Sequence, residues 1–166
     1  MKKRLIPFVM LAAIVLLITA CPYTSSVPID NPSVKVNNNL LGKWVKTSDQ
    51  TNEHPTYFVI TNIGDLKYNI VKNEYNSYDS AYSQTVYVSH ISKINQIDFM
   101  NMQQDGKGDY YLYKIVLGSG EFALFEITDN IDEKFNTSEE LKAFITKNMN
   151  LSFFYNKDEE RYIKQN

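Results

Sequence analysis

The sequence contains one cysteine, Cys21, and two histidines in 166 residues. A single cysteine excludes an intramolecular disulfide, although an exported domain could carry one. Two histidines without a cysteine partner cannot assemble a tetrahedral zinc site alone. The sequence also lacks a G-x-S-x-G segment, the signature of a hydrolase nucleophile elbow. These absences leave no recognisable motif for catalysis or metal binding.

The remaining candidates for chemistry have simpler structural interpretations. His54 lies beside Pro55 in a polar turn, and His90 lies in a strand rich in Val, Tyr and Ser, so both are interpreted as structural histidines rather than general bases. The segment from Asp105 to Asp109 lacks the spacing and terminal glutamate of an EF-hand, and a solvated hairpin is predicted there.

Acidic residues cluster from Glu126 and Asp129 to Glu140. Paired carboxylates can hydrolyse glycosides, but this density is better explained by the charge preference of a helix N-terminus and by solubility. We therefore predict a protein without catalytic residues, metal or cofactor, which is not an enzyme.

Long apolar runs are absent except at the N-terminus. Lys2, Lys3 and Arg4 precede an apolar run over residues 5–20, broken only by Pro7 and Thr19. This pattern is typical of a secretory signal peptide. The run is shorter than the roughly 20 residues that a spanning helix needs, and it ends at a cysteine.

The segment Ile18-Thr19-Ala20-Cys21 resembles the bacterial lipoprotein box. The resemblance implies that residues 1–20 are removed and that Cys21 carries the acyl chains, such as palmitate, of a lipoprotein in the bacterial cell envelope. Pro22, in place of an aspartate, favours the outer membrane if the cell is Gram-negative. The alternative is an ordinary secretory signal with an unrelated cysteine.

Positive charge is scarce after the signal. Residues 1–20 hold three of the 17 basic residues and none of the 19 acidic ones, so 14 basic and 19 acidic residues remain, a net charge of −5. A nucleic-acid-binding face needs an excess of basic residues, so no nucleic-acid partner is expected. The remaining chain predicts a lipidated cysteine with a flexible tether at 21–39, rich in Pro, Ser and Asn, and one domain at 40–166.

Short strand-like runs alternate with turn signals from Leu40 onward, which predicts a mainly β domain. Eight such runs favour an antiparallel up-and-down barrel or a strongly curved sheet. The expected strands are Gly42–Thr47, Thr56–Asn62, Lys67–Lys72, Thr85–Ile91, Gln96–Met102, Tyr110–Leu117, Glu121–Thr128 and Leu151–Tyr155.

One helix is predicted before the last strand, over Thr137–Met149. Thr137 and Glu140 form a capping-box pattern at its start. Leu141, Phe144, Ile145 and Met149 then recur at helical spacing, which predicts an apolar face that packs against the sheet or an end of the barrel.

Gly42 and Trp44 at the first strand resemble the G-x-W pattern of the lipocalin and wider calycin families. The resemblance implies a barrel whose closed end is sealed by Trp44, with the side chain of Arg161 covering the indole. The helix position differs from the lipocalin pattern, in which the helix follows the eighth strand, and the alternative is a Trp44 that is only a core aromatic.

Aromatic residues gather on the later strands, and strand alternation predicts that Tyr111, Tyr113 and Ile115 point inward. Together with Phe125 they are the expected lining of a ligand cavity, and a filled core is the alternative. The segment with Tyr75, Tyr78 and Tyr82 is a candidate recognition loop, or only a long hairpin.

These features predict a membrane-anchored, non-enzymatic binding module that holds a small apolar ligand or lipid. The alternative is a filled barrel that acts as a protein-interaction module, such as an envelope assembly factor or inhibitor, through the tyrosine-rich loop.

Overall fold

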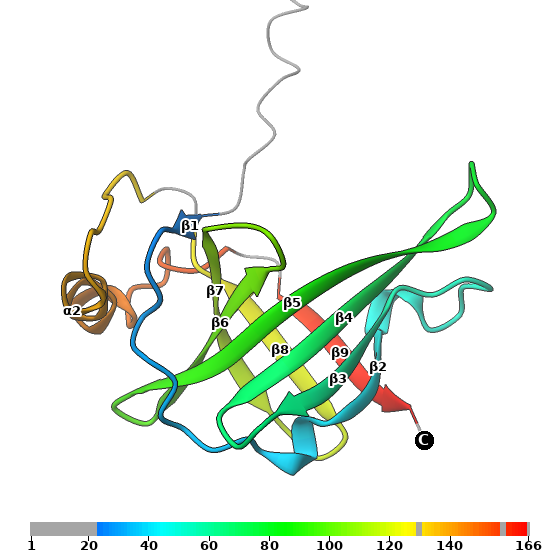
Figure 1. Ribbon diagram of the computed structural model, residues 1–166, viewed down its shortest axis with the longest axis horizontal. Coiled ribbons are helices and arrows are strands. Elements are labelled where there is room, and N and C mark those ends of the chain that lie inside the picture. The colour runs from blue at the N-terminus through cyan, green and yellow to red at the C-terminus, as the bar shows by residue number, and fades with distance from the viewer. Residues whose placement is uncertain (1–22, 129–130, 157–158, 166) are drawn as a thin grey trace, which may run out of the picture.

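Eight antiparallel strands form a closed barrel, and the computed structural model describes residues 23–128, 131–156 and 159–165. Each strand pairs with its neighbours in sequence, and β9 closes the ring between β8 and β2 (Figure 1). The mainly β fold and the up-and-down order agree with the sequence. The strands are β2 (Gly42–Lys46), β3 (Tyr57–Ile63), β4 (Lys67–Asn76), β5 (Ala81–Ile94), β6 (Ile97–Gln104), β7 (Tyr110–Leu117), β8 (Glu121–Glu126) and β9 (Glu160–Gln165).

Short elements surround the barrel. A two-residue strand, β1 (Thr24–Ser25), pairs with β7, and two 3-10 turns, η1 (Asn38–Leu40) and η2 (Thr47–Asp49), flank β2. Helix α2 (Ser138–Asn148) precedes the last strand, as predicted. None of the helices in the described ranges is long and apolar enough to span a membrane.

The predicted last strand, Leu151–Tyr155, is wrong. These residues form a turn after α2, and the strand pairing they make is a single bridge between Tyr155 and Ile127, with Phe154 buried in the core outside the barrel. The last strand is β9, in which only Tyr162 of the three inward-facing side chains, Glu160, Tyr162 and Lys164, is aromatic or apolar, so the strand lacks an apolar pattern. Apolar content favoured residues 151–155, but closure of the ring requires pairing with both β2 and β8, which β9 provides.

The barrel interior is filled at one end. Leu40 in η1 and the buried Trp44 lie at this closed end, where Trp44 Nε1 donates a hydrogen bond to the Leu40 carbonyl at 2.8 Å. Gly42 has a φ of +126°, and a Cβ there would lie 3.1 Å from the Lys164 side chain, so glycine suits this position. Phe122 packs edge-on against Trp44, with ring centroids 4.8 Å apart. The closed end therefore has a solid aromatic core.

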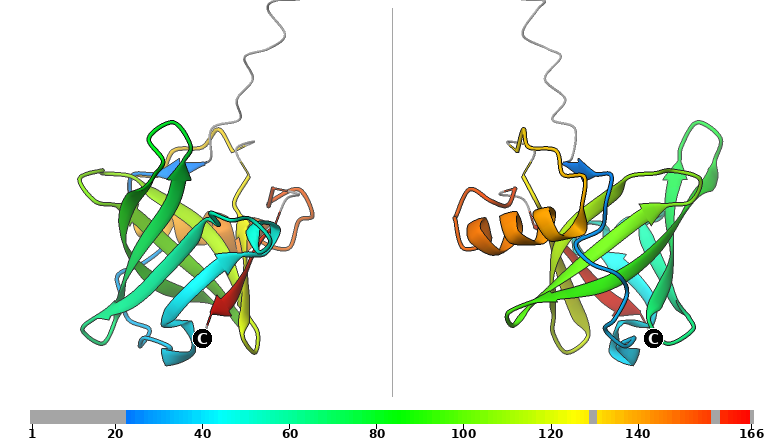
Figure 2. Two further views of the ribbon diagram at one scale, coloured as in Figure 1. Left: turned by 90° about the vertical axis from the view of Figure 1, so that its right-hand side faces the viewer. Right: turned by 60° about the vertical axis from the view of Figure 1, so that its left-hand side comes forward.

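A second core lies outside the barrel, on the outer face of β5, β6 and β7. Outward-facing Phe99 and Leu112 are covered by α2, whose Leu141 and Ile145 are fully buried, and by Ile29 from the N-terminal segment. Figure 2 shows this segment running down the outside of the barrel beside α2. The predicted apolar face of the helix thus packs on the sheet rather than in an end of the barrel.

Residues 23–37, here named the N-terminal strap, do not form the flexible tether that the sequence predicts. The backbone N–H of Ile29 donates to Asn101 Oδ1 at 2.8 Å, and the backbone N–H of Asn37 donates to the Tyr68 hydroxyl at 2.7 Å. Proline and asparagine suit this segment because its hydrogen bonds go to side chains of the barrel rather than to a continuous strand. Cys21 and residues 1–20 lie outside the described residues.

Polar side chains fasten the strap. Asp30 accepts a hydrogen bond from Ser92 Oγ and forms an ion pair with Lys142 of α2 at 2.9 Å. His90 Nε2 donates to the Asp30 carbonyl at 2.8 Å, and Asn101 Nδ2 donates to Ser92 Oγ at 2.8 Å. Asp30 is therefore held by β5 and by α2, while Asn101 of β6 holds the neighbouring Ile29.

Thr137 and Glu140 cap the N-terminus of α2. Thr137 Oγ1 accepts a hydrogen bond from the Glu140 backbone N–H at 3.2 Å, and the Glu140 carboxylate accepts one from the Asn136 backbone N–H. We expect Thr137→Ala to lower the free energy of unfolding by about 1 kcal/mol, because the backbone N–H of Glu140 in the first turn of α2 loses its side-chain acceptor. Urea denaturation measures this change.

The matched control is Thr146→Ala within the same helix. Thr146 Oγ1 donates back to the Lys142 carbonyl, so its removal costs no cap and introduces a better helix former. Equal destabilisation by the two substitutions would contradict the capping role of Thr137.

Candidate functional site

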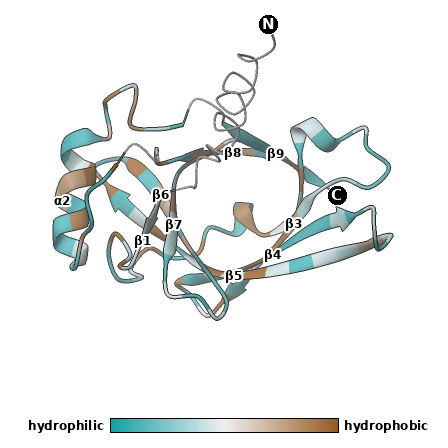
Figure 3. Ribbon diagram, turned by 90° about the horizontal axis from the view of Figure 1, so that it is seen from above, coloured by the Kyte–Doolittle hydropathy of each residue, from teal (hydrophilic) through white to brown (hydrophobic). Residues whose placement is uncertain are grey.

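The open end of the barrel holds a cavity of about 620 Å³. Seen from above, the strands form a ring around this end (Figure 3). This volume lies within the range of about 300–1,000 Å³ that is usual for small-molecule sites. The lining combines apolar, aromatic and charged side chains from β2 to β9 and the turn before β9: Lys46, Phe58, Lys72, Tyr87, Met102, Tyr111, Tyr113, Leu124, Glu126, Asn156, Glu159 and Glu160.

Strand alternation places these side chains. Tyr111 and Tyr113 point inward from β7, and Leu124 and Glu126 point inward from β8, each two residues apart. The cavity lies above the closed-end core, because each strand carries large apolar residues at its inner positions toward that end. The barrel is therefore half filled and half hollow.

Three stacked rings form the floor of the cavity. Tyr162 lies between Phe58 and Phe122, with ring centroids at 4.7 and 4.9 Å. Phe122 in turn contacts Trp44. A ligand in the cavity would rest on the aromatic face of Phe58, which is both part of the floor and part of the lining.

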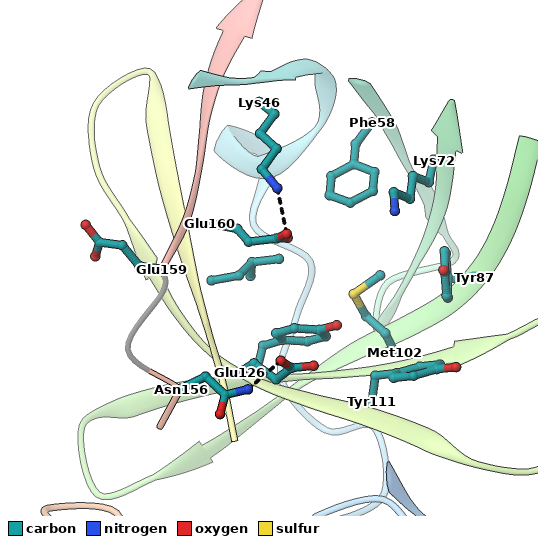
Figure 4. Close-up of a pocket in the computed structure, with 12 residues that line it drawn as sticks. Lys46, Phe58, Lys72, Tyr87, Met102, Tyr111, Glu126, Asn156, Glu159 and Glu160 are labelled. Carbon is teal, nitrogen blue, oxygen red and sulfur yellow. Dashed lines mark hydrogen bonds and ion pairs between the residues drawn. The ribbon is translucent and has the colours of Figure 1, made fainter. Parts of the chain in front are cut away.

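A charged cluster lies on one wall, as Figure 4 shows. Glu160 Oε1 accepts from Lys46 Nζ at 2.8 Å, and Glu160 Oε2 accepts from the Tyr162 hydroxyl at 2.8 Å. Burial opposes ionisation of Glu160, but the bonds from Lys46 and Tyr162 and the charge of Lys46 outweigh it, so its pKa lies below the ordinary value. Glu160 is therefore a carboxylate at neutral pH.

Tyr113 and Tyr87 are neutral hydrogen-bonding groups at the cavity. Burial, followed by the negative charges of Glu126 and Glu160, raises the pKa of Tyr113. Burial also raises the pKa of Tyr87, with smaller effects from Tyr111 and Glu74. Each hydroxyl can donate to or accept from a polar ligand group while its ring contacts an apolar part.

The acidic side chains at the rim already have interactions. Asn156 Nδ2 donates to Glu126 Oε2 at 2.7 Å, and Arg161 forms an ion pair with Glu159 at 2.6 Å. On the facing wall, Lys72 pairs with Glu74 at 2.8 Å. A ligand with a polar or charged group would exchange some of these contacts for its own, while its apolar part would lie against Met102 and Leu124.

Two of the four residues predicted to line a ligand cavity lie at the cavity. Tyr111 and Tyr113 line the cavity, whereas Ile115 points inward but belongs to the core below it. Phe125 faces the outside, where Lys114 Nζ lies 5.0 Å from its ring centroid, so its assignment to the lining is wrong. Its neighbours Leu124 and Glu126 occupy inward positions, because the even-numbered residues of β8 face the barrel interior from Phe122 onward.

The predicted cover of Trp44 is a different residue. Arg161 points away from the indole and pairs with Glu159, whereas Lys164 Nζ lies 5.3 Å from the Trp44 ring. Lys164 is the register partner of Trp44 between β9 and β2, so both side chains share one face of the sheet. Arg161 is three residues earlier in β9 and faces the other way, and its assignment to this role is wrong.

The candidate recognition loop is a long, regular hairpin. β4 and β5 pair as far as Asn76 and Ala81, and the ribbon extends beyond the barrel (Figure 1). Tyr75 stacks on His54 with centroids 3.7 Å apart, and Tyr82 packs edge-on against Tyr75. Tyr78 at the turn is 94% exposed. Only one of the three tyrosines therefore presents its whole ring to solvent.

Sequence reasoning missed the charged half of the cavity. Lys46, Lys72 and Glu160 sit at inward positions where a core pattern predicts apolar residues. Strand alternation could have revealed two of them, because Lys46 lies two residues after Trp44 and Lys72 two residues after Ile70, on the same inward face. Glu160 had none, because the strand that carries it was not predicted.

The histidines and acidic segments have structural surroundings. His90 is buried under the strap, where burial lowers its pKa despite the hydrogen bond to Asp30, and His54 stacks on Tyr75 at the surface. Among the described residues, no three His, Cys, Asp or Glu side chains form a potential metal site. Asp105 and Asp109 flank the exposed turn between β6 and β7, and Asp129 lies outside the described residues.

These features define a closed eight-stranded antiparallel barrel with a cavity at one end. No family model, curated protein or solved structure matches the chain. Its function is therefore inferred from the cavity and from the N-terminal sequence.

Glu160 makes the stability of the cavity wall depend on pH. A carboxyl with a lowered folded-state pKa stabilises the fold above its unfolded pKa of about 4.3, and this contribution is lost as pH falls through the folded value. We expect Glu160→Gln to cost about 1 kcal/mol at pH 7, because the cluster loses one charge-assisted bond at a partly exposed site. Urea denaturation at pH 7 and pH 3 measures the difference from the unsubstituted protein, which should shrink at pH 3.

Glu159→Gln is the matched control. Glu159 pairs with Arg161 at the surface, and the loss of such a solvent-screened pair is expected to change stability little and without the pH dependence of the Glu160 cluster. A pH-independent effect of Glu160→Gln would contradict the ionised cluster.

Proposed function

We propose that this chain is a lipoprotein of the bacterial cell envelope that binds a small amphiphilic molecule in the open end of its barrel. The cavity of about 620 Å³ above a solid aromatic floor is the observation that carries the proposal. The binding is non-enzymatic, in the manner of a lipocalin-like carrier. The basic start, the apolar run and the small residues before Cys21 support the lipid anchor.

The lining supports an amphiphile rather than a purely apolar ligand. Phe58, Met102 and Leu124 offer an apolar surface, while Lys46 and Lys72 bring charged groups to the same cavity. Burying a charged wall against a hydrocarbon would remove water from these groups without replacing their hydrogen bonds, which is costly. A ligand with an aliphatic or aromatic part and a polar or charged group satisfies both surfaces.

A protein-interaction role has narrower support. Tyr75 and Tyr82 are engaged with His54 and with each other, so the candidate recognition surface reduces to Tyr78 at the hairpin turn. Protein interfaces of standard size bury about 800 Å² on each partner, far more than one side chain provides. We therefore favour ligand binding as the main function.

Native mass spectrometry of the full chain, extracted from the envelope of its own host, tests the proposal. We expect the protein to retain a reproducible small mass in addition to the acyl groups on Cys21, because the cavity would otherwise be filled with water. A bare acylated protein in repeated preparations would contradict ligand binding, whereas a chain without acyl groups would contradict the anchor.

A fluorescent amphiphile tests whether ligand binding takes place in the cavity. We expect Tyr87→Ala to weaken the binding of 1-anilinonaphthalene-8-sulfonate by about fivefold, because a ring contact worth about 1 kcal/mol is lost from the cavity. The dissociation constant is measured by fluorescence titration. Tyr57→Ala is the control, since Tyr57 is half-buried on the outer face under Lys43. Equal weakening by both substitutions would place the probe outside the cavity.

A further inference from the structure

The strap begins at the open end of the barrel. Thr24 pairs with Tyr111, which lines the cavity, and Ser25 pairs with Tyr110. The strap then follows the outer face toward the closed end, where the Val36 N–H donates to the Asp65 carbonyl at 2.8 Å. In Figure 1, β1 lies at the upper end of the barrel and η1 at the lower end.

Docking of the strap shortens the link to the lipid. A flexible tether over 21–39 would have an r.m.s. span of about 25 Å and would let the domain tumble. In the structure, the chain is held from Tyr23 onward, so only two residue steps, at most about 7 Å, separate it from Cys21. A lipid attached to Cys21 would therefore be restricted to the neighbourhood of the cavity end, because two residues cannot reach from Tyr23 to η1.

Exposed aromatic side chains lie toward the same end. Tyr78 is 94% exposed at the tip of the β4–β5 hairpin, which rises at the upper right of Figure 1, toward the same end of the molecule as β1. Phe153 is 68% exposed in the turn that leads to Asn156 of the cavity. Aromatic residues are enriched where proteins meet the membrane interface, because their rings tolerate the boundary between apolar and polar surroundings.

The charged residues in the turns at the open end do not attract the domain to anionic lipids. Asp79, Asp105 and Asp109 lie in the turns of the open end, with Lys107 among them. Polybasic segments draw proteins to anionic membranes, and this rim has the opposite character. Its approach to the bilayer depends on the anchor and on the docked strap.

We propose that the open end of the barrel faces the membrane that holds Cys21, so that the ligand passes between the bilayer and the cavity. This inference rests on the proposed lipid anchor and cavity, and it narrows the ligand to an amphiphile that partitions into the membrane. Asn101, Ser92, His90 and Lys142 set the orientation because they hold the strap to the barrel and α2.

The test uses the full acylated chain in vesicles of phosphatidylethanolamine and phosphatidylglycerol that contain a nitroxide-headgroup lipid. One variant, Tyr78→Cys, carries an environment-sensitive fluorophore at the open end. The matched control variant, Ser119→Cys, carries the same fluorophore in the β7–β8 turn at the closed end. Acylation of Cys21 leaves the introduced thiol as the labelling site. We expect the label at position 78 to lose most of its fluorescence and the label at 119 to lose little.

A linker variant tests the role of the short connection. Insertion of 20 Gly and Ser residues between Pro22 and Tyr23 restores a flexible tether, so the two labels should then be quenched to the same extent. Stronger quenching at position 119 than at 78, or equal quenching without the linker, would overturn the orientation.

Co-flotation with the vesicles separates the two proposals. A chain that does not float lacks the anchor, and then both the membrane part of the proposed function and this inference are wrong. A chain that floats and binds the fluorescent amphiphile, but shows the reversed quenching pattern, overturns the orientation alone.

Discussion

The side-chain amide of Asn101 is the contact on which the outer half of the structure depends. This fully buried residue lies on the outward face of β6, accepts a hydrogen bond from the Ile29 backbone N–H and donates to Ser92. A buried amide that lost these partners would cost about 1–3 kcal/mol. The strap therefore has one register on the barrel, and this register places Ile29 in the outer core and Thr24 beside the cavity.

Two cores result from one sheet. The inward face of the barrel holds the aromatic floor and the cavity, and the outward face of β5, β6 and β7 needs cover because it carries Phe99 and Leu112. Helix α2 and the strap supply that cover, so the chain segments before and after the barrel strands are parts of the same domain. The cavity remains open because no segment in the described ranges fills the end where Tyr111 and Glu160 lie.

Alternation was the strongest signal in the sequence. It predicted the inward direction of Tyr111, Tyr113 and Ile115, and the capping pattern at Thr137 predicted the start of the helix within one residue. It was less informative where polar residues point inward. Lys46 and Lys72 face a water-accessible cavity, so they do not show the apolar pattern by which a buried strand is recognised. The same reason concealed β9, which carries charged residues at both ends of the barrel.

The sequence by itself determined the strand-rich composition, the capped helix before the last strand and the signal-like N-terminus, because each of these is encoded by neighbouring residues. Only the tertiary structure decided which end of the barrel is hollow, that Lys164 rather than Arg161 covers Trp44, and that the residues after Tyr23 are docked. These outcomes depend on strand register and on contacts such as Ile29 with Asn101, 72 residues apart in the chain. Local patterns do not encode a register that is set by closure of the whole ring.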